Sequence, residues 1–436
     1  MNIVQITPGA GRMYCGNCLR DNALVAELRK AGHQALMVPL YLPLTLDEED
    51  QSAGTPIFFS GINVFLDQKS RLFRRAPGWL HRLLGSRPLL NWAAGRAAKT
   101  RAADVGELTV SMLRGEEGRQ ARELDELVRW LPSHQKPEVV CLSNALLLGL
   151  ARRLRSDVGA AVVCMLQGED AFLDALPEPH RRTAWQTLTE RAADVDLFVA
   201  PSRYFAELMG RRLGLAPERV RVVPNGIDLA GYEEPPQAEG RRPKEGPPVL
   251  GYFARMCQEK GLDTLIEAFI RLKEHGRAGN LRLSVGGSCG PADEPFVKTL
   301  RQRLAAAGYL GQTEFRPNLS RPEKLDFLAS LSVFSVPARY GEAFGLYVLE
   351  ALAAGVPVVQ PRTAAFPEVI AATGGGALCD PDNPAALAET IEALLRAPEK
   401  AQALGVAGQR AVFEQFSAPV MARNMAAVFA DARGRR

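Results

Sequence analysis

The sequence predicts an α/β protein built from two similar halves, and three observations lead to this fold class. Strand-length apolar runs alternate with helix-length stretches from the first residues onward, which is typical of parallel α/β sheets. Segment 232–248 interrupts the alternation with Pro, Gly and charge, the composition of an interdomain linker. The alternation then restarts, and 436 residues are enough for two separate cores.

The first half opens as a strand, a helix and a second strand. "MNIVQITPG" alternates like a strand, and "LRDNALVAELRKAGH" places Leu24 and Leu28 on one helix face, with a basic last turn and Gly32 as its stop. "QALMVPLYL" then returns as a strand. Further strands are expected at "PEVVCLSN", "AAVVCMLQG", "VDLFVAPS" and "RVRVVPNG".

The second half repeats this order. Strands are expected at "VLGYFAR", "LRLSVGG", "TEFRP" and "SVFSVPA", with helices between them at "LDTLIEAFIRLKEHG", "PFVKTLRQRLAAAG" and "RPEKLDFLASL". We therefore predict two Rossmann-like domains, residues 1–231 and 249–416, joined by the linker 232–248. The amphipathic C-terminal helix, 417–433, is expected to pack back on the first domain.

Charge and composition are ordinary for a soluble globular protein and point to no particular partner. The net charge of +4 is small, so we expect no nucleic-acid partner, and no run reaches the roughly 18 apolar residues of a membrane span. The first residues lack a basic leader and a long apolar run, so we expect a cytoplasmic protein. The seven cysteines are scattered and lie mostly in apolar contexts, which predicts reduced, buried thiols.

Segment 69–101 departs from the α/β pattern. It contains no acidic residue, and its many lysines and arginines alternate with Phe73, Trp79 and Trp92. A solvated helical insertion accounts for such a composition. The alternative is a contact surface for anionic lipid at the inner face of the membrane, or for a phosphorylated acceptor.

A ligand site is predicted where "FSVPARYGEAFGLYVLEALAAG" passes from a strand through a glycine-containing loop into a helix. Ligands of open α/β sheets lie beyond the carboxyl ends of the strands, and a helix start favours anions. Gly345 would let the backbone approach a phosphate, while Glu342 and Glu350 could accept hydrogen bonds from sugar and ribose hydroxyls. The alternative is one solvated glutamate and one helix-terminal charge.

A second pattern points to the same edge of the second half. "GYFARMCQEKG" places Arg255 and Lys260 directly after the first strand of that half. Each alone would be an ordinary surface cation. Two cations and a helix start at one sheet edge could together hold a diphosphate.

These motifs together resemble the retaining nucleotide-sugar glycosyltransferases of the GT-B fold, family 4. That family has an Arg and Lys pair and two glutamates with seven residues between them at its donor site. The likeness extends to "TPGAGRMYCGNCLRDN", "VVPNGID" and "GALCDPDNPAALAETIEALL". It implies two Rossmann-like domains facing across a cleft, and transfer of a hexose from a nucleoside-diphosphate sugar to a sugar, lipid-linked or small-molecule hydroxyl.

The resemblance also implies residue roles. As catalytic residues, Arg255 and Lys260 would hold the diphosphate and Glu342 would face the transferred sugar, while Glu350 would accept the ribose hydroxyls. Backbone N–H groups of four consecutive residues would assist in donor binding: Ala343, Phe344, Gly345 and Leu346.

In the first domain, the resemblance would bring Gly9 and Gly11 against the donor phosphates. Many relatives place a histidine near the reacting sugar, where this chain has "CMLQGEDAFLD". We expect this stretch to lie in the cleft on the acceptor side, and its polar residues are Gln167, Glu169 and Asp170. Around Phe366 the chain also lacks the family's usual glycines, so bulk there could change which sugar fits.

No metal and no cofactor are expected, because the nucleotide sugar is a substrate and the five histidines form no ligand spacing. Within the same fold, a nucleotide-sugar epimerase or a glycosyl phosphorylase is the alternative. From another class, "YCGNC" has the form of a thiol redox motif, so a thiol oxidoreductase using Cys15 and Cys18 is a further alternative, as is a non-catalytic binder of sugar nucleotides or of a membrane surface.

Overall fold

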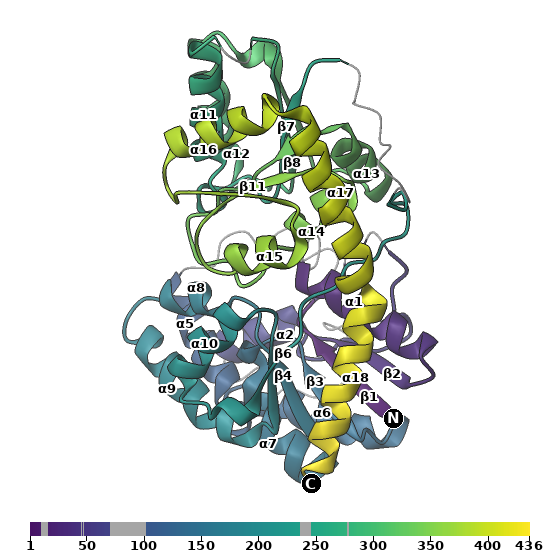
Figure 1. Cartoon of the computed structure of the whole chain (residues 1–436). Helices are drawn as coiled ribbons and strands as arrows, with labels where there is room; N and C mark the ends of the chain where they lie inside the picture. The colour runs from purple at the N-terminus through teal and green to yellow at the C-terminus, as the bar shows by residue number, and fades with distance from the viewer. Residues whose placement is uncertain (10–15, 45, 47, 70–101, 236–245, 277–278) are drawn as a thin grey trace. The chain divides into compact units, whose positions relative to one another are not determined.

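The computed structural model describes residues 1–9, 16–44, 46, 48–69, 102–235, 246–276 and 279–436. The chain divides into two compact units (Figure 1). Unit 1 comprises Met1–Pro224 and Ala418–Arg436, and unit 2 comprises Asn225–Ser417. Most of the segment 232–248, expected to be a linker, lies outside the described residues, and so does nearly all of the basic segment 69–101.

Each unit contains one six-stranded sheet whose described strand pairs are all parallel, so the predicted α/β class is confirmed. The strands of unit 1 follow the order β2-β1-β3-β4-β5-β6. Their bounds are β1 Asn2–Thr7, β2 Gln34–Pro39, β3 Val139–Leu142, β4 Ala161–Met165, β5 Leu197–Ala200 and β6 Val220–Val222.

The helices of unit 1 include the predicted first and last helices of the chain. Gly32, with φ of 84°, follows the first of them, as expected of a stop residue. The bounds are α1 Gly16–Lys30, α2 Gly61–Lys69, α5 Ala102–Leu113, α6 Ala121–His134, α7 Ala151–Arg153, α8 Glu169–Asp174, α9 His180–Arg191, α10 Arg203–Leu213 and α18 Ala418–Gly434.

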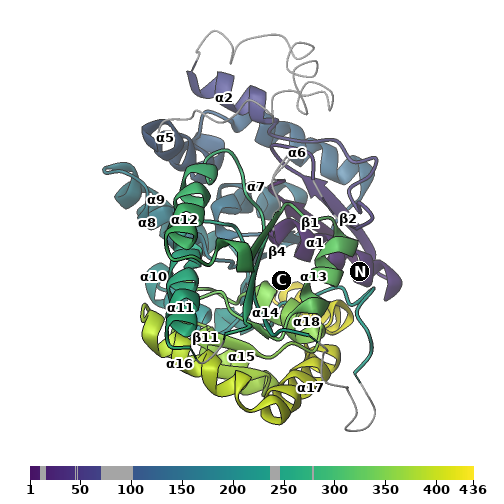
Figure 2. The ribbon, with the colours of Figure 1, turned by 90° about the horizontal axis from the view of Figure 1, so that it is seen from above.

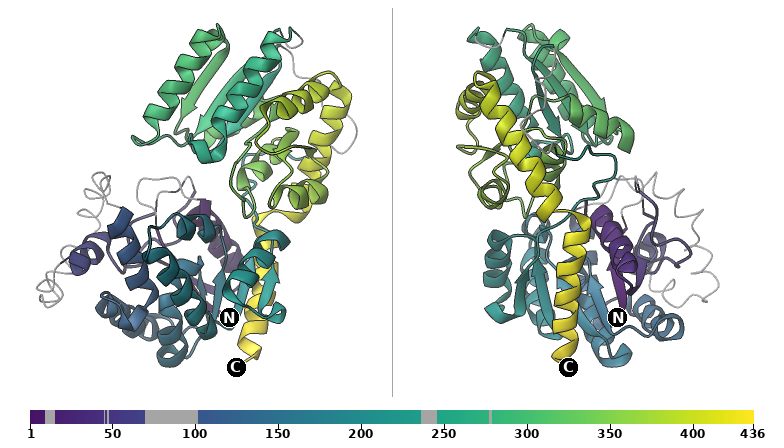
Figure 3. Two further views of the ribbon diagram at one scale, coloured as in Figure 1. Left: turned by 90° about the vertical axis from the view of Figure 1, so that its left-hand side faces the viewer. Right: turned by 45° about the vertical axis from the view of Figure 1, so that its right-hand side comes forward.

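Helix α18 completes the core of unit 1. Its Met421, Met425 and Phe429 are buried together with Leu24 of α1 and with apolar side chains of β1, β3, β4 and β5. Figure 3 shows this helix running alongside the strands of unit 1. Residues from the two ends of the chain therefore share one apolar cluster, whose burial is the main stabilising contribution.

Unit 2 has the strand order β12-β11-β10-β7-β8-β9. Counted from the first strand of the unit this is 6-5-4-1-2-3, the order of doubly wound dinucleotide-binding sheets. The bounds are β7 Val249–Phe253, β8 Arg282–Gly287, β9 Thr313–Pro317, β10 Val333–Phe334, β11 Val358–Pro361 and β12 Gly376–Cys379.

The helices of unit 2 pack against one another in a connected series. Helix α11 contacts α12 and α16, and α17 contacts α14, α15 and α16; Figure 2 shows α11 and α16 side by side. The bounds are α11 Leu262–Glu274, α12 Glu294–Ala306, α13 Arg321–Ser330, α14 Leu346–Ala353, α15 Phe366–Thr373, α16 Pro384–Leu395 and α17 Pro398–Gln415. No described helix in either unit combines the length and the apolar character that crossing a bilayer requires.

Gly261 lets two loops of unit 2 approach each other closely. It follows the short 3₁₀ turn Gln258–Lys260 and has φ of 71°. A Cβ atom here would lie 1.9 Å from the carbonyl oxygen of Pro337, in the segment after β10. Only glycine fits both the left-handed backbone and the space. The loop after β7 is thereby held against the segment after β10.

Two acidic side chains are buried together in unit 1. Glu123 of α6 and Asp67 of α2 are 5% and 1% exposed. Burial raises the pKa of Glu123 to about 8, and the hydrogen bond with Asp67 and its charge act in the same direction. The folded protein therefore holds a proton here that an unfolded glutamate would release near its ordinary pKa.

We predict that this pair makes unfolding pH-dependent. Between the ordinary glutamate pKa and about pH 8, the folded protein binds one proton more than the unfolded chain does. The free energy of unfolding should therefore fall as the pH rises through this range, by up to about 1.4 kcal/mol per pH unit. Glu123→Gln should flatten this dependence in urea titrations between about pH 6 and 9. Glu207→Gln, on the exposed side of α10, is the control and should leave the slope unchanged. Equal slopes in all three proteins would contradict the assignment.

We predict that Gly261→Ala destabilises unit 2 more than Gly276→Ala. Both glycines have positive φ, 71° and 67°, but nothing lies within 4 Å of a Cβ at Gly276. The control should cost about 1 kcal/mol from backbone strain alone. The close contact at Gly261 should add about 1–3 kcal/mol, measured by chemical unfolding. Similar losses for both variants would show that the Pro337 contact relaxes freely.

Candidate functional site

The predicted donor residues of unit 2 follow the two strands at its topological switch point. Strands β7 and β10 are neighbours in the sheet, and the chain extends the sheet outward from them in opposite directions. Arg255 and Lys260 follow β7, whereas Glu342 and Gly345 follow β10. In open α/β sheets, ligands bind outside the carboxyl ends of the strands at such a switch point.

Lys260 and Glu342 form an ion pair between these two loops. Their side chains are only 19% and 11% exposed. The hydroxyl of Tyr340 donates to Oε1 of Glu342 at 3.1 Å, the same oxygen that Lys260 contacts. The backbone N–H of Arg339 also donates to the carbonyl of Glu259 at 3.0 Å, which fastens the loops to each other.

Aromatic rings enclose the ammonium group of Lys260. Its Nζ lies 4.9 Å from the ring centroid of Tyr340 and 5.3 Å from that of Tyr347, within cation–π range. Burial alone would lower the pKa of Lys260, but the Glu342 charge outweighs it, so the pKa lies above the ordinary lysine value. Lys260 is therefore a permanent cation, held in place by an acid and two rings.

Arg255 is held by an acid that the sequence did not single out. Asp293, the residue before α12, accepts from Nε of Arg255 at 3.1 and 3.2 Å and from an Nη at 2.9 Å. This hydrogen bonding raises the pKa of Arg255. The Asp293 side chain is 9% exposed and the Arg255 side chain 57% exposed, so the guanidinium is fixed by a buried acid while part of it faces solvent.

The segment before α14 has the geometry of a close-approach loop. Gly345 has φ of 88° and precedes the helix, which begins at Leu346. The first N–H groups of a helix have no partner within it, so they are available to an anion. The side chains of Ala343 and Phe344 are buried, which leaves the backbone as the part of these two residues that a ligand could contact.

Glu350 lies inside α14 and faces a different cation from Glu342. Nζ of Lys324, on α13, is 3.2 Å from Oε1 of Glu350. The side chains are 5% and 15% exposed, respectively. Sequence reasoning missed Lys324, because a lysine in the polar pattern of α13 is indistinguishable from a solvated one. The two predicted glutamates thus belong to two separate ion pairs.

Phe366 occupies the core of unit 2. It is fully buried and its ring centroid lies 6.5 Å from that of Tyr347. The Cε1 atom of its ring would lie 3.1 Å from the Cβ of any residue that replaced Gly345. The expectation that a bulky residue here contacts the sugar is therefore wrong for the Phe366 side chain. This side chain instead packs in the core beside the Gly345 loop.

In unit 1, Gly9 follows β1 with φ of 69°, and a Cβ there would lie 2.1 Å from the carbonyl oxygen of Leu42. This position therefore requires glycine. Gly11, the second predicted glycine, lies outside the described residues.

The three polar residues predicted after β4 differ in their surroundings. Glu169 is buried, and its oxygens accept from the backbone N–H groups of Ala145 and Gln167, each at 2.7 Å. It therefore joins the loops after β3 and β4, and each of its two carboxylate oxygens accepts from a backbone N–H group. Gln167 is half-buried. Burial raises the pKa of Asp170, whose Oδ1 has no hydrogen-bond partner in the described part of the chain.

Sequence reasoning also missed a buried charge pair at the switch point of unit 1. The side chains of Arg20 and Asp21, on α1, are fully buried and form an ion pair of 2.5 Å. The guanidinium also donates to the carbonyl and the hydroxyl of Ser143, after β3, at 3.1 and 3.2 Å. The Arg-Asp pair in "CLRDNAL" gave no signal beyond an ordinary helix surface.

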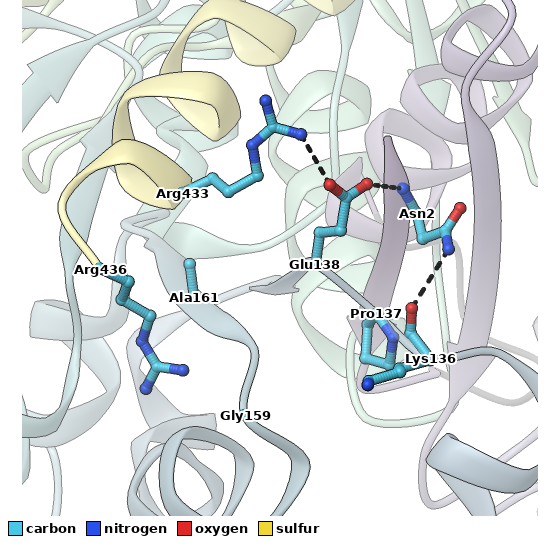
Figure 4. A pocket seen from close by; sticks show the side chains of 8 residues that line it. All are labelled: Asn2, Lys136, Pro137, Glu138, Gly159, Ala161, Arg433 and Arg436. Carbon is cyan, nitrogen blue, oxygen red and sulfur yellow. Dashed lines mark hydrogen bonds and ion pairs between the residues drawn. The ribbon is translucent and has the colours of Figure 1, made fainter.

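A shallow pocket of unit 1 lies at the amino ends of its strands, opposite the ends at which the loops with Gly9 and Gln167 begin (Figure 4). There Glu138 accepts from the backbone N–H of Asn2 at 2.7 Å and from Arg433 at 2.6 Å. Asn2 is the first residue of β1 and Glu138 directly precedes β3, so the pocket is at the amino ends of the strands. Ligands of open α/β sheets bind at the other edge, so we do not include it in the candidate site.

Neither a metal centre nor a redox centre is apparent in the described residues. Among them, no group of three or more His, Cys, Asp and Glu residues is placed to hold a metal ion. Cys18 is buried in α1 and Cys15 lies outside the described residues.

Comparison with known proteins identifies the family. Residues 234–411 match the family described as glycosyl transferases group 1, and residues 105–230 match glycosyltransferase family 4. A D-inositol 3-phosphate glycosyltransferase of Xylanimonas cellulosilytica is 30% identical over 271 residues, 60% of this chain and 62% of the relative. The GDP-mannose-dependent alpha-(1-6)-phosphatidylinositol monomannoside mannosyltransferase of Mycolicibacterium smegmatis is 30% identical over 280 residues, 61% of this chain and 68% of the relative.

Solved structures share the fold over the whole chain. Sucrose-phosphate synthase of Thermosynechococcus elongatus has a TM-score of 0.73 at 17% identity, with full coverage of both chains. Anabaena HepE in complex with UDP has a TM-score of 0.70 at 16% identity, covering 99% of this chain and 100% of the other. In sequence, the chain spans about half to two thirds of the length of the curated relatives that it matches. This chain belongs to the glycosyltransferases of the GT-B fold.

Proposed function

We propose that the protein is a retaining glycosyltransferase that moves a hexose from a nucleoside-diphosphate sugar to an acceptor hydroxyl. The single observation that carries the proposal is the Lys260–Glu342 pair at the switch point of unit 2. A permanent cation and a carboxylate at the carboxyl ends of adjacent strands can address the two ends of the bond that breaks, the phosphate and the sugar.

The proposed chemistry depends on stabilising the leaving group. As the glycosidic C–O bond to the diphosphate breaks, negative charge grows on the departing phosphate. Lys260 and Arg255 neutralise that charge, and the N–H groups at the start of α14 stabilise it further by hydrogen bonding. The acceptor hydroxyl attacks from the face that the diphosphate leaves and passes its proton to a phosphate oxygen, so the anomeric configuration is retained. This reaction requires no protein base and no metal ion.

Binding of the donor would rearrange the charges of the site. In the structure Lys260 contacts Glu342 and Arg255 contacts Asp293. We propose that the diphosphate attracts both cations, while Glu342 turns to the hydroxyls of the transferred sugar. Glu350, on α14, then accepts the ribose hydroxyls. The acceptor side is assigned to unit 1, where Gly9, Gln167 and Asp170 follow β1 and β4.

The names of the relatives support a nucleotide-sugar donor and leave a choice of acceptors. One relative is named for an inositol phosphate acceptor, another for GDP-mannose and a phosphatidylinositol mannoside, and a structural neighbour is a complex with UDP. The acceptor of this chain is accordingly proposed to be a sugar, a lipid-linked sugar or a small polyol. Lipid contact through segment 69–101 remains a prediction.

Product analysis separates this proposal from its alternatives. With donor and acceptor present, a glycosyltransferase yields a new glycoside and a nucleoside diphosphate. An epimerase would yield a changed free sugar or nucleotide sugar, and a phosphorylase would yield a sugar phosphate that depends on inorganic phosphate. Activity that disappears in a Cys15→Ser/Cys18→Ser variant and persists in Glu342→Gln would favour the thiol oxidoreductase instead.

We predict that one class of nucleoside-diphosphate sugar stabilises the protein. UDP-, GDP- and ADP-sugars should be compared by thermal shift, because a ligand at 100 times its dissociation constant adds about 2.7 kcal/mol to the free energy of unfolding. Inorganic pyrophosphate and the free sugars are the controls and should give much smaller shifts. If none of the three donor classes stabilises the protein or binds by calorimetry, the proposed function is wrong.

We predict that Lys260→Ala and Glu342→Gln each lower kcat by about 10²–10³-fold, because both side chains act at the bond that breaks. Lys298→Ala, an exposed lysine on α12, is the matched control and should retain full turnover. Near-ultraviolet circular dichroism and unfolding curves confirm that each variant is folded. Near-normal turnover in either site variant would place the reaction elsewhere.

A further inference from the structure

Lys324 is a buried lysine next to the candidate donor site. Its side chain is 5% exposed, and its Nζ lies 3.2 Å from Oε1 of Glu350. Lysine is almost never fully buried unless it is paired, because removing its charge from water is unfavourable. A well-packed apolar residue usually serves the fold as well as a buried ion pair. The presence of a charge on this face of α13 therefore calls for an explanation beyond packing.

Another buried lysine in the same unit shows what a structural role looks like. Lys273, at the end of α11, is 7% exposed and its Nζ donates to the backbone carbonyls of Gly279 and Leu281. These contacts close the chain between α11 and β8. Lys324 differs, because its partner is the side chain of a residue proposed to bind the donor.

The geometry of the pair leaves one carboxylate oxygen for a ligand. Lys324 takes Oε1 of Glu350, and no hydrogen bond to Oε2 occurs among the described residues. A carboxylate with one oxygen fixed by a charge-assisted hydrogen bond cannot rotate freely. Such an oxygen is a strong and directed acceptor for the hydroxyls of a ribose.

We propose that Lys324 is a positioning residue that holds the Glu350 carboxylate oriented toward the ribose of the donor, and thereby sets a preference for ribonucleotides. The inference rests on the proposed function, and it adds a residue on a separate helix to the site. Without Lys324, the half-buried carboxylate is free to turn toward water. Its hydrogen bonds with vicinal hydroxyls then weaken.

The test compares ribose recognition in matched variants. Calorimetry measures the affinities of UDP, GDP and ADP and of their 2′,3′-dideoxy counterparts for the wild-type protein, Lys324→Met, Glu350→Gln and the double variant. Lys273→Met is the control for loss of a buried lysine. For the nucleotide that binds best, the wild-type protein should prefer the ribose form by about 10–100-fold, as expected for hydrogen bonds to a charged acceptor.

In Lys324→Met the ribose preference should fall to about threefold or less, whereas in Lys273→Met it should stay at the wild-type value. The double variant should lose no more preference than Glu350→Gln alone, because the two side chains act as one unit. Lys324→Arg should recover part of the preference. A purely structural role would weaken the ribose and dideoxy forms equally and leave their ratio unchanged.

The outcomes separate the two proposals. If the wild-type protein prefers ribose and Lys324→Met keeps that preference, the role of Lys324 is refuted while the proposed function stands. If the wild-type protein binds nucleotides without distinguishing ribose from dideoxyribose, the role of Lys324 is likewise refuted. If none of the diphosphates binds at all, both proposals fail. Should Lys324→Met prove unstable, Lys324→Leu, which also removes the donor to Oε1, is the second variant, and an unchanged ratio there likewise refutes the role of Lys324.

Discussion

The ion pair between Lys260 and Glu342 is the constraint on which the candidate site depends. Each charge is largely removed from water, so neither would be tolerated alone, and each comes from a different loop at the switch point of unit 2. The two loops must therefore lie close together, and Gly261 makes this approach sterically feasible. The doubly wound order of the sheet puts the loops side by side, and the attraction between Lys260 and Glu342 holds them together.

The same principle extends across the site. Arg255 with Asp293 and Lys324 with Glu350 repeat the pattern of a cation matched by a nearby acid. A cluster of three unpaired cations would destabilise the folded protein by mutual repulsion, whereas paired charges can be assembled in advance of the ligand. The proposed anionic donor would then compete with the carboxylates for cations that are already in position. Such cations would fix the orientation of the donor as well as attract it.

The fold and the position of the site were accessible from sequence because both follow from local patterns. Alternating apolar runs predict parallel strands, and Arg255, Lys260, Glu342 and Gly345 all lie in the loops that follow two of these strands. Lys324, Asp293 and Arg20 were missed for a common reason. Their environment is created by tertiary contacts between elements far apart in the chain, and a charged residue in a polar helix pattern reads as solvated. The surroundings of Glu169 were equally hidden from the sequence, because its two backbone donors come from separate loops.

The route of the chain gives the two units unequal independence. Unit 2 is one continuous stretch, Asn225–Ser417, inserted into unit 1, whereas unit 1 is assembled from both ends of the sequence. A fragment that stopped at Pro224 would leave bare the apolar side chains that Met421, Met425 and Phe429 of α18 cover. Unit 2 can therefore be excised as a single piece. Unit 1 can be produced alone only by joining its final helix directly to the end of the first 224 residues. Any shortening of the carboxyl terminus should therefore destabilise the amino-terminal unit.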